Sequence, residues 1–203
     1  MASIDTARLD PRVREAEVIV AADVTNPLCG PQGASLVYGP QKGASPAMAG
    51  ELDAALAHYA DVVQRDLGID LAGIPGAGAA GGLAGGLIAF CGAEIRPGFE
   101  VVANAAGLAG RLQRADLVIT GEGRLDSQSA YGKVTAGMAR EARTAGKRIV
   151  AIAGSVSGDE AARPFDNVFA LTPDPAQADE AMAHAAELLA DAAEAAGEWW
   201  RKR

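Results

Sequence analysis

Four short apolar runs alternate with polar or glycine-rich sequence along this chain. They lie at 17–22, 115–120, 148–153 and 167–171. Each is rich in valine, isoleucine or leucine, and an almost continuous apolar run of this length is typical of a strand buried on both faces of a parallel sheet. The pattern therefore predicts four strands, and a further short strand is predicted at Leu36–Tyr38.

Between these runs, apolar residues recur every third or fourth position, which indicates amphipathic helices. The clearest helix begins after Ser45, has Pro46 in its first turn and ends near Leu67, before Gly68. Further helices are predicted at 80–91, 98–112, 131–145 and 179–199. Strands that alternate with helices at this spacing are typical of right-handed crossovers. The predicted fold class is α/β, with a mainly parallel sheet and flanking helices.

The first polar loop, residues 23–42, follows the first predicted strand. It combines Asp23, Asn26, Gln41 and Lys42 with several prolines and glycines, and it has too few charges for a disordered segment. Such residues orient hydroxyl and carboxylate groups, while the ammonium group neutralises a phosphate. An alternative stays open, because Asp and Asn after a strand commonly form local turn hydrogen bonds.

The second polar loop, residues 120–133, follows the second predicted strand. It holds Glu122 and Asp126 beside Arg124 and Lys133, and the helix predicted to start near Ser129 offers free N–H groups to an anion. This mixture suits a metal, a substrate hydroxyl and phosphate oxygens. In the alternative interpretation, a serine of the loop is an ordinary helix cap and Glu122 pairs with Arg124 on the surface.

Other candidate motifs indicate function less specifically. The stretch PGAGAAGG matches neither the Walker A spacing nor a dinucleotide fingerprint, so it is either a close-packing segment or a loop beside a phosphate. His58 and His184 fall within predicted helices without further ligands nearby in the sequence. Cys29 and Cys91 have neither disulfide nor zinc-site spacing, which fits a reducing compartment.

Charge and hydropathy argue against some classes of partner and location. The net charge of -8 over 203 residues disfavours nucleic acid and anionic membrane surfaces, which bind basic patches. No apolar window approaches a membrane span, and the N-terminus lacks the pattern of an export signal. We therefore expect a cytoplasmic protein with a small-molecule substrate.

Four motifs in order, DVTNPLCGPQGAS, YGPQKGAS, PGAGAAGG and TGEGRLDSQSAYGK, resemble the type I glycerate kinase family. The similarity extends from about Leu9 to Glu194. It implies transfer of the γ-phosphoryl group of ATP, with Mg²⁺, to a hydroxyl of D-glycerate, which gives 2-phosphoglycerate. It also implies two α/β domains with the active site in the cleft between them.

The resemblance also assigns residues. It implies orienting or metal-linked carboxylates at Asp126 and Asp23, and phosphate contacts at Arg124 and Lys133, although it identifies no complete metal ligand set. The residues that match the family's substrate- or nucleotide-binding motifs are Asn26, Gln41, Lys42, Gly76, Gly78, Glu122, Gln128 and Ser129. Thr135 stands where relatives usually have proline.

Family members are nearly twice as long as this chain, and the motifs of their N-terminal half do not occur here. Residues 1–203 are therefore expected to be the C-terminal portion of a glycerate kinase, with subregions at about 1–95 and 96–203. The expected partner is a companion N-terminal chain or a second copy of this chain. The alternative is a remnant or half of a split kinase that binds ligand without turnover.

Overall fold

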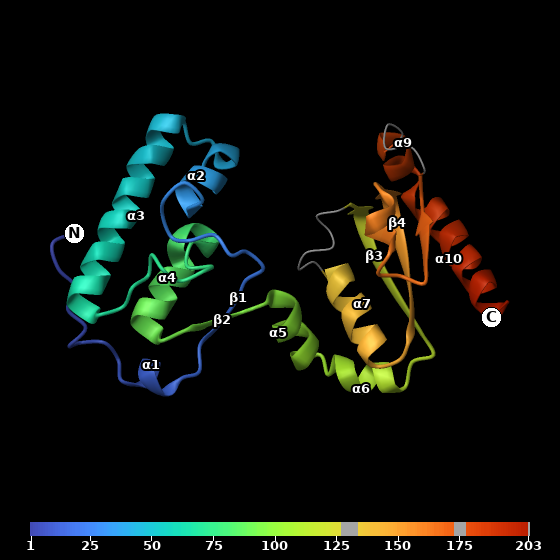
Figure 1. Cartoon of the computed structure of the whole chain (residues 1–203), viewed down its shortest axis with the longest axis horizontal. Helices are drawn as coiled ribbons and strands as arrows, with labels where there is room; N and C mark the ends of the chain where they lie inside the picture. Colours follow the sequence, from blue (N-terminus) through green and yellow to red (C-terminus); the bar gives the residue numbers. More distant parts are fainter. Residues whose placement is uncertain (127–133, 173–177, 203) are drawn as a thin grey trace. The chain divides into compact units, whose positions relative to one another are not determined.

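The computed structural model describes residues 1–126, 134–172 and 178–202. Contacts divide it into two compact units, Met1–Gly98 and Phe99–Arg203, which we call unit 1 and unit 2 and describe separately (Figure 1). Both units combine parallel strands with helices, which confirms the α/β class predicted from the sequence. None of the described helices is long and apolar enough to cross a membrane.

Unit 1 is built around a pair of short parallel strands, with Val20 opposite Ile95. Its core gathers buried residues such as Leu28, Val63 and Leu71. The elements are α1 (Arg12–Glu15), β1 (Ile19–Ala21), α2 (Ala34–Tyr38), the 3₁₀ helix η1 (Pro40–Lys42), α3 (Pro46–Leu67), α4 (Ala79–Cys91) and β2 (Glu94–Arg96).

Helix α3 has the ends that the sequence predicts. The Ser45 hydroxyl accepts a hydrogen bond from the Met48 amide at 3.3 Å, and Pro46 occupies the first turn. Gly68 ends the helix in the left-handed conformation with φ of 74°, which glycine adopts without a Cβ penalty. Local sequence signals therefore set both ends of this long helix.

Helix α4 begins less regularly than the sequence predicts. Ala80, Gly81 and Gly82 all have positive φ, so the regular helix starts at Leu83. A Cβ at Gly82 would lie 2.9 Å from the Leu28 side chain. The tight turn is therefore required by packing against the core of unit 1.

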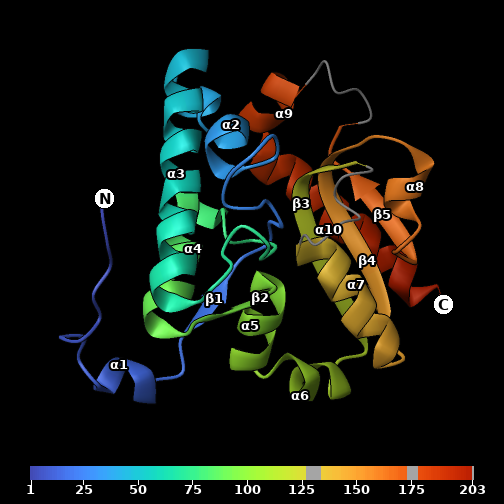
Figure 2. The ribbon, with the colours of Figure 1, turned by 60° about the vertical axis from the view of Figure 1, so that its left-hand side comes forward.

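Unit 2 contains a three-stranded parallel sheet in the order β3–β4–β5, with helices on both faces (Figure 2). Helix α7 packs on β3 and β4, whereas α10 packs on β4 and β5. The elements are α5 (Gly98–Ala105), α6 (Leu108–Gln113), β3 (Leu117–Leu125), α7 (Val134–Thr144), β4 (Arg148–Val156), α8 (Asp159–Ala162), β5 (Asn167–Ala170), α9 (Ala178–Ala183) and α10 (Ala185–Arg201).

Two predicted helices are broken. The helix expected at 98–112 is interrupted at Gly107, whose φ of 63° separates α5 from α6. The helix expected at 179–199 is interrupted at His184, which stands between α9 and α10. In both cases the apolar periodicity continues across the break, so periodicity alone concealed it.

Strand predictions differ from the structure in three places. The strand expected at Leu36–Tyr38 is wrong, because this segment forms the last turn of α2, closed by the Gly39 amide on the Ser35 carbonyl. Strand β2 was not predicted, since its alternating sequence is only three residues long. Strand β3 continues five residues beyond its predicted end at Thr120, so the second polar loop begins as strand.

Candidate functional site

Asp23 lies just beyond β1 and is exposed. One of its carboxylate oxygens accepts a hydrogen bond from the Gly98 amide at 2.8 Å. A Cβ at Gly98 would lie 2.9 Å from the other oxygen, so glycine there leaves room for the carboxylate. The start of the first polar loop is thus tied to the chain just after β2, with the carboxylate near the surface.

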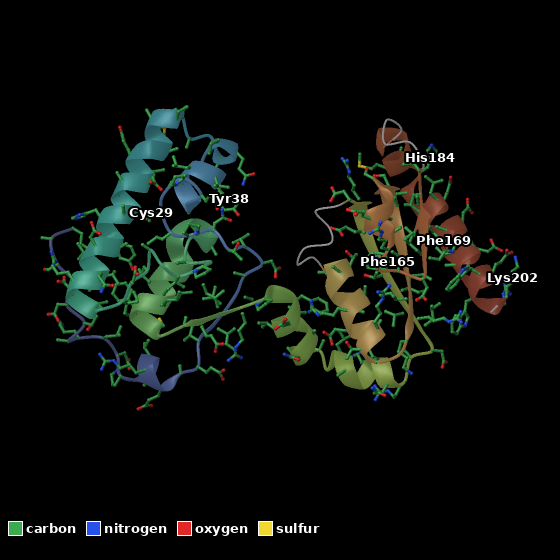
Figure 3. All side chains as sticks on the ribbon, in the orientation of Figure 1. Cys29, Tyr38, Phe165, Phe169, His184 and Lys202 are labelled. Carbon is green, nitrogen blue, oxygen red and sulfur yellow. The ribbon has the colours of Figure 1, made fainter. Side chains whose placement is uncertain are left out.

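Asn26 holds the first polar loop together (Figure 3 labels its partner Tyr38). Its amide nitrogen donates to the Gln32 carbonyl at 2.8 Å, and its amide oxygen accepts from the Tyr38 hydroxyl at 2.6 Å. These bonds agree with the turn-forming interpretation of this residue. A ligand contact at Asn26 stays a prediction.

The glycine-rich segment packs directly on the first polar loop. The Gly78 amide donates to the Asn26 carbonyl at 3.1 Å, and a Cβ at Gly78 would collide with the Pro27 carbonyl oxygen. Gly76 has φ of 84°, and a Cβ there would approach the Val24 carbonyl at 3.1 Å. These contacts agree with the interpretation of PGAGAAGG as a close-packing segment.

Gln41 and Lys42 lie on η1, and both are exposed. Lys42 lines a cavity of about 460 Å³ in unit 1 together with Tyr38 and apolar residues of α3 such as Met48 and Leu52. An ammonium group beside an apolar cavity suits a ligand with an anionic group and a less polar body.

Cys29 lies in the first polar loop without a disulfide partner (Figure 3). Burial raises the pKa of its thiol, and the carboxylates of Asp53 and Asp61 raise it further. The protonated thiol is a poor nucleophile. This environment is unlike that of a catalytic cysteine.

In unit 2, Glu122 lies on β3 and accepts a hydrogen bond from the Thr135 hydroxyl of α7 at 2.9 Å. Thr135 is only 1% exposed. A buried donor orients a carboxylate more firmly than an exposed one because water competes less for the bond. Thr135 therefore fixes one oxygen of Glu122.

Arg124 and Asp126 lie at the end of β3. The Arg124 Nε atom is 3.8 Å from an Asp126 oxygen, and its Nη2 atom donates to the Ser157 hydroxyl at 3.3 Å. The Arg124 side chain is largely exposed and that of Asp126 is less so. Gln128, Ser129 and Lys133 lie outside the described residues.

A second cavity, of about 420 Å³, lies at the carboxyl ends of β3 and β4. Its walls include Glu122. They also include two polar residues that the sequence analysis did not select, Ser155 and Thr172. Ser155 pairs in register with Arg124, so the signal that would have found it is its position on the neighbouring strand. Ligands of parallel sheets bind at this end of the strands.

Metal ligands are not concentrated in the described part of the chain. Across 1–126, 134–172 and 178–202, no three histidine, cysteine, aspartate or glutamate side chains gather as a metal site. In phosphoryl-transfer enzymes, one or two carboxylates and the substrate phosphates hold Mg²⁺. Glu122 and Asp126, near the same strand end, fit that requirement.

Each unit has a cavity lined by one charged residue of a polar loop, Lys42 in unit 1 and Glu122 in unit 2. Asp23 and Lys42 stand in unit 1, whereas Glu122, Arg124 and Asp126 stand in unit 2. Such a set neutralises and orients phosphate, hydroxyl and carboxylate groups.

Comparison with known proteins agrees with this chemistry. A model of the glycerate kinase family matches residues 1–201. The chain is similar to the glycerate kinase of Halalkalibacterium halodurans, with 47% identity over 95% of this chain and 52% of that protein. Its identity to the glycerate 2-kinase of Escherichia coli is 51%, over 77% of this chain and 41% of the relative.

A solved structure is also similar. The crystal structure of a Salmonella typhimurium LT2 protein assigned as glycerate kinase 2 matches with a TM-score of 0.71 and 48% identity. The match covers 84% of this chain and 44% of that one. The chain thus spans about half the length of the curated relatives it matches.

Proposed function

This chain belongs to the glycerate kinase family, and we propose that it carries catalytic residues for ATP-dependent phosphorylation of D-glycerate to 2-phosphoglycerate. The observation that carries the proposal is the group of Glu122, Arg124 and Asp126 at the carboxyl end of a parallel strand, where Glu122 lines a cavity. Phosphoryl transfer needs positioning and charge neutralisation more than covalent chemistry. Acids and cations at such a strand end meet that need.

Arg124 and Lys133 are the proposed phosphate contacts. The Arg124 guanidinium is largely exposed and lies near Asp126, whose carboxylate orients it, and a guanidinium binds phosphate oxygens through two parallel hydrogen bonds. In unit 1, Lys42 and Gln41 are proposed to bind the anionic or hydroxyl groups of a ligand. Asn26, Gly76 and Gly78 act there mainly by shaping the first polar loop.

Asp126 and Asp23 are the proposed orienting or metal-linked carboxylates. Mg²⁺, when bound, supplies neutralisation of phosphate oxygens. Asp126 would hold it, and Glu122, fixed by Thr135, would orient a water or a substrate hydroxyl nearby. Gln128 and Ser129 complete the second polar loop as proposed nucleotide contacts.

An ATP-using enzyme with two free cysteines fits the cytoplasm, which is our proposed location.

The test is ADP release by the purified chain with Mg-ATP, with and without D-glycerate. The same assay is run after addition of the unmatched segment of the H. halodurans glycerate kinase, produced as a separate polypeptide. We expect glycerate-dependent ADP release in at least one of these samples. Absence of glycerate dependence in both would contradict the proposal.

Single substitutions test the residue assignments in whichever sample is active. We expect Asp126→Asn and Arg124→Gln to lower kcat by at least about 100-fold, in the range seen when a charge-stabilising group is removed. Glu51→Gln is the matched control, because Glu51 is an exposed carboxylate on α3 in unit 1, outside the second polar loop that these substitutions test. Unchanged turnover in Asp126→Asn would remove that residue from the site.

A further inference from the structure

Glycine occupies three positions at the carboxyl ends of β3 and β4 in unit 2. They are Gly121 and Gly123 on β3 and Gly154 on β4, and all three line the 420 Å³ cavity. Glycine weakens a strand interior because it has no side chain to pack and loses more conformational entropy on folding than other residues. A glycine inside a strand therefore commonly marks a place where another backbone or a ligand approaches closely.

Packing within the protein explains two of the three glycines. A Cβ at Gly154 would collide with the Gly123 carbonyl oxygen, and a Cβ at Gly121 would lie 3.0 Å from the Ile152 carbonyl oxygen. At Gly123, by contrast, a Cβ would meet no atom of the described residues within 4 Å. The φ of Gly123 is not positive, so its backbone conformation does not require glycine. The open space at Gly123 is therefore available to a ligand.

The two glycines of β3 lie on one face of the sheet. Side chains alternate between the faces of a strand, so Gly121 and Gly123 face away from the side on which the Glu122 carboxylate accepts from Thr135 of α7. The opposite face is the one on which α9 and α10 contact β4 (Figure 2). Without side chains at these two positions, a planar group can approach the peptide groups of β3 closely.

The rest of this cavity is largely apolar. Met182 of α9 and Leu189 of α10 line it and are 67% and 49% exposed. Among the described lining residues there is no lysine or arginine, and the only charged one is Glu122. Anionic groups such as carboxylates and phosphates bind where cations neutralise them, so they fit this cavity poorly. A flat, uncharged aromatic group fits it better, because it can lie against the glycines and contact the thioether of Met182.

We propose that this cavity binds the purine base of the nucleotide substrate, and that Gly123 keeps the space for it. The inference rests on the proposed function, which supplies ATP as the phosphoryl donor. The cavity volume of 420 Å³ is in the usual range for small-molecule sites. Arg124, the proposed phosphate contact, directly follows Gly123 on β3. The base and the phosphates are thus assigned to neighbouring residues at one strand end.

The cavity of unit 1 is the competing place for the base. It also has apolar side chains, Met48 and Leu52, but Lys42 lies on its wall. The ammonium group makes that cavity the better one for an anionic group. The uncharged base is therefore assigned to unit 2.

The experiment measures binding of Mg-ATP to the whole 203-residue chain by isothermal titration calorimetry, without glycerate. Gly123→Ala places a methyl group in the open space, and we expect it to raise the Kd for ATP at least about tenfold, because added atoms clash in a filled site. Inorganic tripolyphosphate, which has no base, should bind the natural chain and Gly123→Ala equally. Absence of ATP binding by the natural chain overturns the proposal, and so does an unchanged Kd in Gly123→Ala.

Gly110→Ala on α6 is the matched control. A Cβ at Gly110 also meets no atom of the described residues within 4 Å, and Gly110 does not line the cavity. The Kd for ATP should therefore stay at the value of the natural chain. Urea unfolding of both alanine variants checks that the chain folds. Equal weakening of ATP binding by the two changes would contradict a specific role of Gly123.

A second pair of variants distinguishes the two cavities. Met182→Ala removes apolar contact from the cavity of unit 2, whereas Met48→Ala makes the same change in the cavity of unit 1. We expect Met182→Ala to raise the Kd for ATP about fivefold, in the range of a lost sulfur–aromatic contact, and Met48→Ala to raise it less. An equal or larger effect of Met48→Ala would overturn the proposal.

Failure of this inference can be told apart from failure of the proposed activity. ATP binding that Gly123→Ala weakens, without glycerate-dependent ADP release, would contradict the activity and support the base site. Glycerate-dependent ADP release with the same ATP affinity in Gly123→Ala and the natural chain would contradict the base site alone.

Discussion

The two polar loops reach their conformations by different means. In unit 1, the first polar loop leaves a strand of three residues and is held by backbone packing at glycines and by the side chain of Asn26. In unit 2, Glu122 and Arg124 stand on a strand of nine residues and are placed by its register with β4. Glycine contacts shape the first arrangement, and sheet pairing shapes the second.

This difference predicts which changes each region tolerates. A loop built on backbone contact has no space for added atoms, so any Cβ at the contact is costly. A strand in register keeps its backbone when one side-chain bond is lost, although the orientation of the bonded group changes. Substitutions can therefore separate loss of structure in unit 1 from loss of orientation in unit 2.

The largest effect is expected for Gly78→Val. Its Cβ would collide with the Pro27 carbonyl oxygen, so the first polar loop must move. We expect a loss of about 3 kcal/mol in the free energy of unfolding, as for strong overpacking, measured by urea unfolding followed by circular dichroism. Gly86→Ala is the control, because Gly86 lies in α4 with open space around it. If Gly78→Val left the free energy of unfolding unchanged, the first polar loop would not be held by this contact.

The next effect is expected for Thr135→Val, which keeps the shape of the side chain and removes the hydroxyl. The lost bond joins a buried donor to the Glu122 carboxylate, and such bonds contribute about 2 kcal/mol. Thr135→Ser retains the hydroxyl and should recover most of the stability. In an active sample, we expect Thr135→Val to lower kcat more than it raises KM. Equal stability of the valine and serine variants would argue against the bond.

A smaller effect is expected for Tyr38→Phe. The change removes the hydroxyl that donates to Asn26 and leaves the Gln32 bond of that residue in place. A single neutral hydrogen bond contributes about 1 kcal/mol. Urea unfolding should show this loss, and exchange of the amides at 23–33 should become faster. Unaltered exchange there would mean that the glycine contacts alone hold the loop.

The smallest effect is expected for Asp66→Asn, a change in unit 1 whose effect on stability depends on pH. The hydrogen bond from Arg65, together with that from the Ile4 amide, lowers the pKa of Asp66 to about 2. Because the folded-state pKa lies below the usual 3.8, the carboxylate stabilises the fold above pH 4 or so and this contribution disappears as the pH falls toward 2. Asp66→Asn should therefore be less stable than the natural chain at pH 6. The difference should vanish near pH 2, and a constant difference would contradict the assignment.

Sequence patterns predicted the structure best where residues close together in the sequence set the structure. Ser45, Pro46 and Gly68 predicted α3 because capping and left-handed termination depend on neighbouring residues. The core segments of β3, β4 and β5 were predicted because buried parallel strands are almost continuously apolar. The break at His184 was missed because the apolar period continues through it.

The candidate site was predicted in part. The sequence selected Glu122, Arg124 and Asp126 from their charge and from their place after a strand. It did not select Ser155 or Thr172, which line the same cavity as Glu122 but lie far from it in the sequence. Roles assigned to individual residues stay predictions.

By itself, the sequence determined the α/β class and the ends of α3, because these depend on periodicity and capping within short windows. The tertiary structure decided that GEGRL continues β3, although glycine and charged residues disfavour strands, because pairing as far as Leu125 with Val156 outweighs that preference. It also decided that Gly78 packs on Pro27, a contact between segments some fifty residues apart. Such contacts depend on how distant segments meet, which no local pattern records.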